Sequence, residues 1–360
     1  DGRAALDSVL REYVVSEAMH ALRIPTTRAL AAVTTGETVT RYRTSPGAVL
    51  ARVASSHLRV GTLEYLAVRG DVEQRRRVVD YALTRHFPEH LDADNPAKAL
   101  LEQVADVQAD LVARWMLVGF VHGVMNTDNM ALSGETLDYG PCAFMEVTDP
   151  DTVFSILDSQ GRYAYGRQPS IAMWNLARLA ESLLPVLADD EPAAIAIGQA
   201  ALERFRDRYD TAWTHGMCGK LGLEAREAAD VELMTDLLAH MHRKELDYTS
   251  TFRRLSDDLR TGSTALGDPS LAGWNIRWRG RLRRDDPAAV AASMDRVNPL
   301  YIPRNHRLEA ALDHAVAGDL APVKEMLEVL ARPFEVQPGR EDYAGAAPSD
   351  FGTYQTHCNT

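Results

Sequence analysis

The feature that most constrains the fold is a change of hydrophobic pattern near residue 62. Before it, runs that are typical of β-strands occupy residues 28–34, 38–43 and 48–54. Gly36 and the pair at 46–47 (Pro-Gly) stand between these runs, where turns are expected. After it, apolar residues recur at helical spacing along most of the chain. We therefore expect a small strand-containing part followed by a large helical part.

A helical period also precedes the strands, at residues 4–22. After residue 62, the expected helices span residues 63–68, 72–87, 97–118, 171–187, 192–214, 225–241, 245–255, 287–297, 307–317 and 321–330. Carboxylates ahead of Pro192 are a start signal for one of them. The sequence thus predicts an N-terminal part (1–61) with a helix and antiparallel strands, a helical lobe (62–336), and an extended tail (337–360) rich in Gly, Pro, Ser and Asp.

The charge and the apolar pattern exclude two kinds of partner. The chain has 360 residues and a net charge of −12, and its short arginine runs at 75–77 and 281–284 contain no interleaved aromatic residues. No nucleic acid is expected as a partner, because phosphate binding needs a basic face, and both runs are expected to be solvated helix faces. No apolar run approaches the ~18 residues that a membrane span needs, so no membrane partner is expected.

The spacing of the three cysteines indicates the compartment of the protein. Cys142, Cys218 and Cys358 are unevenly placed and fit neither a secreted disulfide framework nor a zinc-binding spacing. The sequence also shows no signal peptide. A cytoplasmic protein is therefore expected, with Cys218 as a buried or half-buried thiol.

Residues 119–145 carry the densest group of polar side chains. His122, Asn126, Asp128 and Asn129 lie within eight residues, and the run Asp138-Tyr139-Gly140-Pro141 follows. Carboxylates and amides on short loops are the oxygen ligands that hard cations prefer. Each run alone is also good turn chemistry. The two together, directly after a long predicted helix, favour a metal and nucleotide site.

These runs have the outline of the loops of protein kinases. His122, Gly123 and Asn129 match the His-x-Asp…Asn loop, and Asp138 opens a counterpart of the Asp-Phe-Gly loop. The position after His-Gly, where a kinase-like base is expected, is Val124, and the carboxylate has moved to Asp128. An altered base position suggests an altered acceptor geometry or attack on a different phosphorus. His122 is expected to hold the loop by hydrogen bonds rather than to act as a base.

Three charged residues of the N-terminal part are open to two interpretations. Arg52 and Arg59 lie close enough in sequence to bind phosphate together, but spacing alone favours two surface ion pairs. Glu12 lies at the edge of the apolar stripe of its helix and is, on that pattern, an ordinary flanking residue.

Longer stretches of the sequence show a resemblance that covers nearly the whole chain. It includes residues 1–4 (DGRA), 16–22 (SEAMHAL), 24–30 (IPTTRAL), 122–130 (HGVMNTDNM), 138–141 (DYGP), 160–165 (QGRYAY), 168–171 (QPSI) and 301–306 (YIPRNH). In these runs the chain resembles the SelO (selenoprotein O, YdiU) family, whose members are pseudokinase-like protein adenylyltransferases. The resemblance implies an α+β, mostly helical, protein-kinase-like two-lobe fold.

The resemblance also implies roles for individual residues. Asp128 matches the catalytic acceptor of the hydroxyl proton, and Asn129 and Asp138 match ligands of Mg²⁺ or Mn²⁺. Arg52 and Arg59 match phosphate contacts of the nucleotide. A second set of matches lies in the N-terminal part, where Asp1 and Gly2 correspond to a pair that touches the nucleotide and Glu12 to the glutamate that pairs with an ATP-binding lysine.

The implied reaction transfers AMP rather than the γ-phosphoryl group. The resemblance implies that ATP lies flipped relative to ordinary kinases, so that AMP passes to Ser, Thr or Tyr hydroxyls of proteins, the enzyme itself included, and pyrophosphate leaves. UTP is an alternative donor. A non-catalytic pseudokinase-type module that binds nucleotide or partners is the alternative function, and an ordinary γ-phosphate kinase is disfavoured by Val124.

Two departures from the family pattern lead to further expectations. The family's Gly-rich loop and lysine lie upstream of the Asp-Gly pair with which this sequence begins, so an incomplete N-lobe, a Glu12 without a partner and weak activity are expected. Cys358 occupies the third position from the C-terminus, where family members carry selenocysteine or cysteine. A disulfide between Cys142 and Cys358 and two unpaired thiols are both left open.

Overall fold

The N-terminal part is a small antiparallel sheet with one helix packed on it. The computed structural model describes residues 2–40, 44–224, 227–282 and 286–356. Strands β1 (Ala4–Ala5), β2 (Arg28–Thr40) and β3 (Thr44–Val53) form a sheet in the order β1-β3-β2. Helix α1 (Leu6–Ala21) packs on one face of this sheet, while Val33 and Val49, paired on the other face, are exposed.

The strand prediction needs two corrections. The runs at 28–34 and 38–40 belong to one strand, β2, and Gly36 lies inside it with a φ of +79° at a register shift between Thr34 and Thr38. A bulge therefore replaces the expected turn. Pro46 and Gly47 lie within β3 rather than at a turn. An ideal Cβ on Gly47 would stand 2.7 Å from Thr35 Oγ1 across the ladder, so a larger residue at this strand position would force a shift. The rest of the second run, 41–43, lies outside the described residues.

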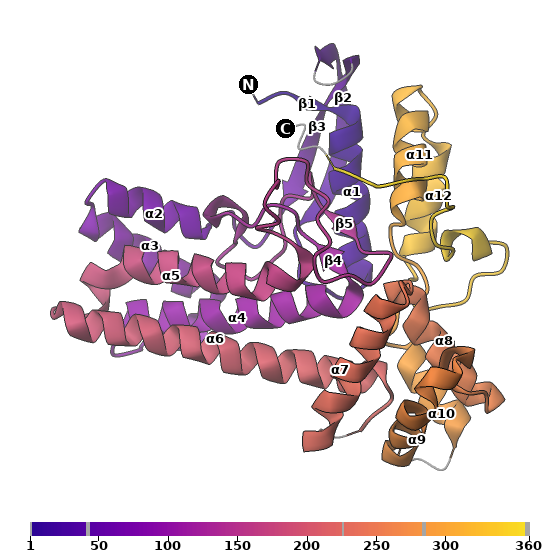
Figure 1. Ribbon diagram of the computed structural model, residues 1–360. Helices are drawn as coiled ribbons and strands as arrows, with labels where there is room; N and C mark the ends of the chain where they lie inside the picture. Colours follow the sequence, from indigo (N-terminus) through magenta and orange to yellow (C-terminus); the bar gives the residue numbers. More distant parts are fainter. Residues whose placement is uncertain (1, 41–43, 225–226, 283–285, 357–360) are drawn as a thin grey trace.

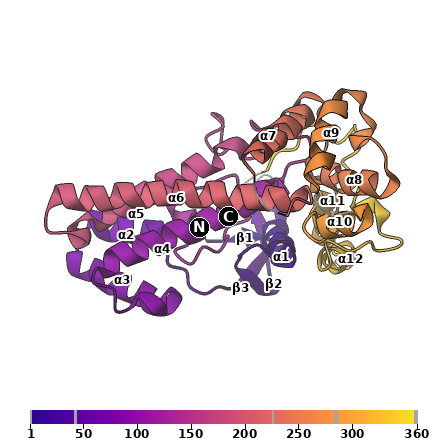
Figure 2. The same cartoon turned by 90° about the horizontal axis from the view of Figure 1, so that it is seen from below.

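The rest of the described chain is mostly helical. Its helices are α2 (Val60–Val68), α3 (Val72–His86), α4 (Pro96–Val118), α5 (Gln168–Leu187), α6 (Glu191–Lys220), α7 (Ala228–Arg243), α8 (Tyr248–Thr261), α9 (Ala272–Arg281), α10 (Pro287–Asp295), α11 (Asn305–Val316) and α12 (Ala321–Leu330). Figure 1 shows α4, α5 and α6 lengthwise beside one another, with α1 at the end of α4 and the pair α11 and α12 next to α1. Figure 2 shows α7 to α10 gathered at one end of α6. The predicted mostly helical α+β fold is confirmed.

Most helices were predictable, and the exceptions have physical causes. Asp190 caps α6 by accepting from the amide of Ala193, as the carboxylates before Pro192 predict. Helix α9 is missing from the prediction because arginines interrupt its apolar stripe, although Trp274 and Trp278 are buried. The 75–77 run is only partly a solvated face, since Arg75 is buried and donates to the carbonyl of Ser182.

The arginine run at 281–284 is described only in part. Arg281 is not simply solvated, because it forms ion pairs with Asp230 and Glu227. Residues 283 and 284 of that run lie outside the described ranges.

Within the described parts of the chain, no helix combines the length and the apolar character that a membrane crossing requires.

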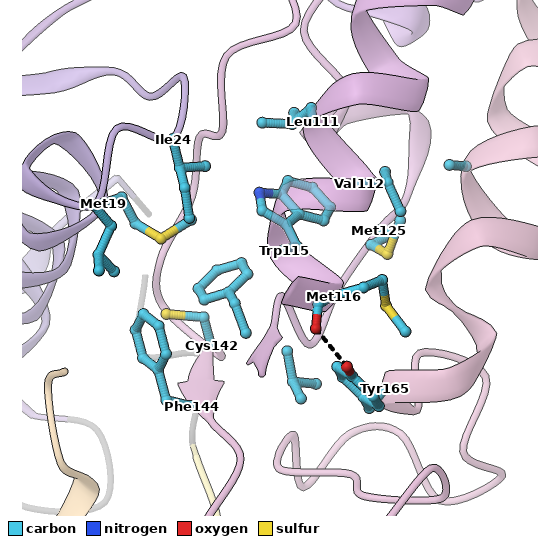
Figure 3. Close-up of a cluster of buried hydrophobic side chains, with 14 of the residues drawn as sticks. Met19, Ile24, Leu111, Val112, Trp115, Met116, Met125, Cys142, Phe144 and Tyr165 are labelled. Atoms are coloured by element: carbon cyan, nitrogen blue, oxygen red, sulfur yellow. Dashed lines mark hydrogen bonds between the residues drawn. The ribbon is translucent and has the colours of Figure 1, made fainter. Parts of the chain in front are cut away.

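A continuous apolar core joins α1, α4 and the loops that follow α4. Figure 3 shows Met19 and Ile24 on one side, Trp115 and Met116 of α4 on the other, and Phe144 and Cys142 below Ile24. The two-residue strands β4 (Phe120–Val121) and β5 (Ala143–Phe144) pair inside this core. The polar loop between them is therefore held at both ends by buried structure.

Lys220, at the end of α6, is a buried cation whose neighbours are aromatic. Its Nζ lies 3.8 Å from the centre of the Phe252 ring and 5.5 Å from that of Tyr248. Burial lowers the pKa of Lys220 from its ordinary 10.5 to about 7. The folded state therefore disfavours the charged form. The resulting cost is absent above pH 10.5, grows as the pH falls, and is complete below pH 7.

We expect Lys220→Met to raise the free energy of unfolding at pH 7 by about 1–4 kcal/mol, since an apolar chain of similar length replaces a buried charge. The gain should shrink toward pH 11, above the ordinary lysine pKa of 10.5, where the folded and unfolded lysines are both mostly neutral. Denaturant unfolding at the two pH values measures it, with the exposed Lys98→Met as the matched control. A loss of stability at pH 7 would show that the ring contacts outweigh burial.

Candidate active site

The site begins where α4 ends. Gly119 terminates the helix in the left-handed conformation (φ +73°), and β4 then pairs with β5. Gly123 follows with a φ of +87°, and an ideal Cβ there would stand 2.5 Å from the carbonyl oxygen of Pro141. Only glycine fits this close approach without a shift of the backbone. The loops around residues 122–129 and 138–142 are thereby placed against each other.

Asn129 and Asp138 meet across these two loops. The Nδ2 of Asn129 donates to Asp138 Oδ2 at 2.8 Å and to the carbonyl of Val124 at 3.0 Å. Asp138 adopts a positive φ of +68°, and its Oδ1 accepts from the amide of Gly140 at 3.3 Å. Both amide hydrogens of Asn129 are therefore used, and within the described ranges its Oδ1 accepts no hydrogen bond.

Asp128 lies next to this pair on a short 3-10 turn, η2 (Thr127–Asn129), and is exposed. An ideal Cβ on Gly61 of α2 would stand 2.3 Å from Asp128 Oδ1. A side chain at position 61 would therefore displace the carboxylate. The main-chain carbonyl of Asp128 accepts from Arg59 Nη1 at 2.8 Å. The start of α2 thus fixes the turn and leaves the carboxylate open to solvent.

Glu12 connects α1 to the second loop. Its Oε1 accepts from the amide of Tyr139 at 2.8 Å and from Arg52 Nη2 at 3.1 Å. Burial raises the pKa of Glu12, and the arginine opposes that rise. The expectation that Glu12 lacks a partner is wrong, because Arg52 from β3 supplies the positive charge. Arg52 does form an ion pair, as spacing suggested, but its partner is buried beside Asp138.

His122 occupies a buried position between the loops. Its Nε2 lies 3.1 Å from the carbonyl of Leu137, and its amide donates to Gln168 Oε1 at 2.9 Å. Burial lowers the pKa of His122 and so favours its uncharged form. These contacts suit the predicted loop-holding role.

The remaining predicted site residues lie in less informative places. Gly2 is exposed just before β1. Among the described residues, no hydrogen bond links it to Asp128. Asp1 and Cys358 lie outside the described residues. Cys142 is buried, its thiol donates to the carbonyl of Tyr139, and burial raises its pKa. Whether Cys142 pairs with Cys358 therefore stays open.

Three residues support the site without having been assigned a role from sequence spacing. Gly61 makes room for Asp128, as described above. Gln168 Nε2 donates to the carbonyl of Phe120 at 2.9 Å, and Asn175 Nδ2 donates to the carbonyl of Met125 at 2.9 Å. For Asn175 the available signal was an amide on the inner face of the helix expected at 171–187, since such groups need partners when buried. Gln168 precedes that expected helix, and only the structure places it at the start of α5.

The donor set fits a hard cation that also binds phosphate. Asp138, Asn129 Oδ1 and the neighbouring Asp128 offer two carboxylates and an amide oxygen. The described residues hold no cluster of three or more His, Cys, Asp or Glu that would enclose a metal by itself. Mg²⁺ is commonly bound by one or two carboxylates together with substrate phosphates. The residues present therefore fit a metal that arrives with a nucleotide.

The sequence matches a known family over most of its length. The family model described as "Protein adenylyltransferase SelO" matches residues 1–331. The protein nucleotidyltransferase YdiU of Mycolicibacterium paratuberculosis is 53% identical over 368 residues, which cover 100% of this chain and 74% of the relative. The proteins of the same name from Geobacillus kaustophilus and Cereibacter sphaeroides are 53% and 55% identical, and in both cases the match covers 100% of this chain and 75% of the relative. The chain belongs to the SelO (YdiU) family of protein nucleotidyltransferases.

Proposed function

We propose that this nucleotidyltransferase uses ATP bound with Mg²⁺ or Mn²⁺ and transfers AMP to Ser, Thr or Tyr hydroxyls of proteins. The observation that carries the proposal is the contact of Asn129 with Asp138 beside the exposed carboxylate of Asp128. It supplies metal ligands and a base within one small region. The description of the matching family, "Protein adenylyltransferase SelO", favours AMP over other nucleotides.

Each residue has a defined part in this reaction. The hydroxyl oxygen of the protein substrate attacks the α-phosphorus, the bond to the bridging oxygen breaks, and pyrophosphate leaves. Asp128 accepts the hydroxyl proton, since its carboxylate is exposed and its backbone is held by Arg59. Asn129 and Asp138 would hold the metal, which would neutralise phosphate charge.

The two arginines are suited to the phosphates. Arg59 is anchored through Nη1 on the Asp128 carbonyl, so its guanidinium stays beside the base. The Nε of Arg52 is buried, but the side chain as a whole is 25% exposed, so its guanidinium remains accessible to a phosphate oxygen. Glu12 orients Arg52 and, through the amide of Tyr139, the loop that carries Asp138.

The position of the label on ATP tests the proposal. The protein, expressed from its complete natural reading frame, is incubated with a protein acceptor, Mg²⁺ or Mn²⁺, and ATP labelled at either the α- or the γ-phosphorus. We expect α-label on protein, release of pyrophosphate and an intact-mass gain of one AMP. Transfer of γ-label with release of ADP would instead assign an ordinary kinase.

Two further outcomes discriminate the alternatives. Thermal stabilisation by Mg²⁺-ATP without any adduct would assign the non-catalytic binding module. Faster transfer from α-labelled UTP than from ATP would assign a uridylyltransferase and reject the AMP donor.

A further inference from the structure

Arg11, the neighbour of Glu12 on α1, is buried and bonded to two residues from the far end of the chain. Its Nη2 donates to Tyr354 Oη at 2.6 Å and forms an ion pair with Glu309 of α11. Tyr354 Oη in turn donates to Glu309 Oε1 at 2.6 Å. We call Arg11, Glu309 and Tyr354 the Arg11 cluster. Its three members bond to one another, so it joins α1, α11 and the C-terminal segment 351–356.

The C-terminal segment is also bonded to the chain that follows Asp138. Thr356 Oγ1 donates to the carbonyl of Pro141 at 2.6 Å, and its amide donates to the carbonyl of Phe154 at 2.8 Å. The ring of Tyr354 packs on Phe154 and Phe351, with centroids 5.9 and 5.6 Å away. Figure 1 shows this tail passing α11 and returning toward α1. The segment therefore contacts both structures that carry Glu12 and Asp138.

The start of α11 is fixed to the same region by the 301–306 motif, to which no role has been assigned. Arg304 is buried and binds both carboxylate oxygens of Asp247, at 2.6 and 3.0 Å, and also the carbonyl of Ala344. Asn305 Nδ2 donates to the carbonyl of Phe144 in β5 at 3.0 Å. Glu309 follows one turn later on this helix. The motif thus sets where Glu309 stands relative to the active-site loops.

We propose that the Arg11 cluster consists of positioning residues for nucleotidyl transfer. A rotation or shift of α1 that the cluster prevents would move Glu12 as well, because the two residues are adjacent on one helix. Glu12 holds the amide of Tyr139 and orients Arg52, so its displacement would loosen both the metal loop and a phosphate contact. The C-terminal segment acts on the reaction through this cluster. The proposal rests on the proposed function for its kinetic part.

The test removes the hydroxyl group of Tyr354 and measures hydrogen exchange in the loop that carries Asp138. In Tyr354→Phe the ring packing remains, but the bonds to Arg11 and Glu309 are lost. We expect hydrogen exchange at the amide of Tyr139, followed by mass spectrometry, to become about tenfold faster, because Glu12 no longer holds it firmly. We expect KM for Mg²⁺-ATP to rise about three- to tenfold with a smaller change in kcat.

A matched variant lies in the same tail. Tyr343, whose ring contacts Arg307, loses only an oxygen in Tyr343→Phe and should leave exchange and KM unchanged. Glu309→Gln weakens the cluster from another element and should reproduce the effect of Tyr354→Phe. It keeps the proposal testable if Tyr354→Phe folds poorly. Arg11→Lys keeps the charge and should give intermediate exchange.

Exchange at Tyr139 that is the same in Tyr354→Phe, Glu309→Gln and the unmodified protein would overturn the proposal. The exchange experiment needs no catalysis, so it decides the positioning role even if no transfer is detected. A complete absence of transfer in the unmodified protein would instead reject the proposed function.

Discussion

Asp128→Asn is expected to lower the rate of nucleotidyl transfer by about 10²- to 10⁴-fold, the range for removal of a general base. The change removes the proton acceptor and keeps the shape of the side chain. The contacts that hold the turn should survive, because Arg59 binds the main-chain carbonyl of residue 128 rather than its carboxylate. Initial rates with α-labelled ATP measure the effect, and thermal shift with Mg²⁺-ATP measures nucleotide binding.

The comparison with Asp138 separates a base from a metal ligand. Asp138→Ala removes the partner of Asn129 and should abolish both transfer and nucleotide-dependent stabilisation. Asp128→Asn should slow transfer by about 10²- to 10⁴-fold and keep most of the stabilisation. Asp92→Asn changes an exposed carboxylate that precedes Asp128 by 36 residues, and it controls for a general loss of negative charge. Transfer by Asp128→Asn within about threefold of the unmodified protein would rule out Asp128 as the base.

The centre of the site was predictable from sequence because its residues are close together along the chain. The spacing between Asn129 and Asp138 is nine residues, and the pairing of β4 with β5 brings them into contact. Local turn signals and the kinase-like outline are therefore sufficient to find them. The position of Gly61 carries no such signal, since its role depends on a carboxylate more than sixty residues away.

The contacts that align α1 with the loops could not be read from local patterns. Arg11 is 298 residues from Glu309 and 343 from Tyr354, and neither helical period nor composition encodes such a contact. Sequence spacing likewise favoured a surface partner for Arg52. In the structure its partner is the buried Glu12, and spacing alone does not reveal that burial. The merging of two predicted strands into β2 has the same cause, since the ladder with β3 overrides the turn preference of Gly36.

Trp115→Ala is expected to cost about 3–5 kcal/mol of the free energy of unfolding, the range for removing a buried aromatic side chain. Trp115 is 1% exposed, and its Nε1 donates to Thr136 Oγ1 at 2.9 Å. Its ring centre lies 5.6 Å from that of Phe120 and 5.3 Å from that of His122 (Figure 3 shows its place on α4). Such a loss is large, because domains are stable by only about 5–15 kcal/mol. Since His122 packs on Trp115 and holds the active-site loop, nucleotide binding at that loop should also weaken.

Two comparisons show whether packing at this position is the cause. Trp174→Ala removes the same side chain where it is 38% exposed and contacts the guanidinium groups of Arg162 and Arg178, so a cost of about 1 kcal/mol is expected. Trp115→Phe keeps most of the ring but loses the bond to Thr136, and should cost about 1–2 kcal/mol. Denaturant unfolding measures all three variants. Equal costs at positions 115 and 174 would mean that the core around α4 does not fix the active-site loop, because the loop is anchored to that core through Phe120 and His122.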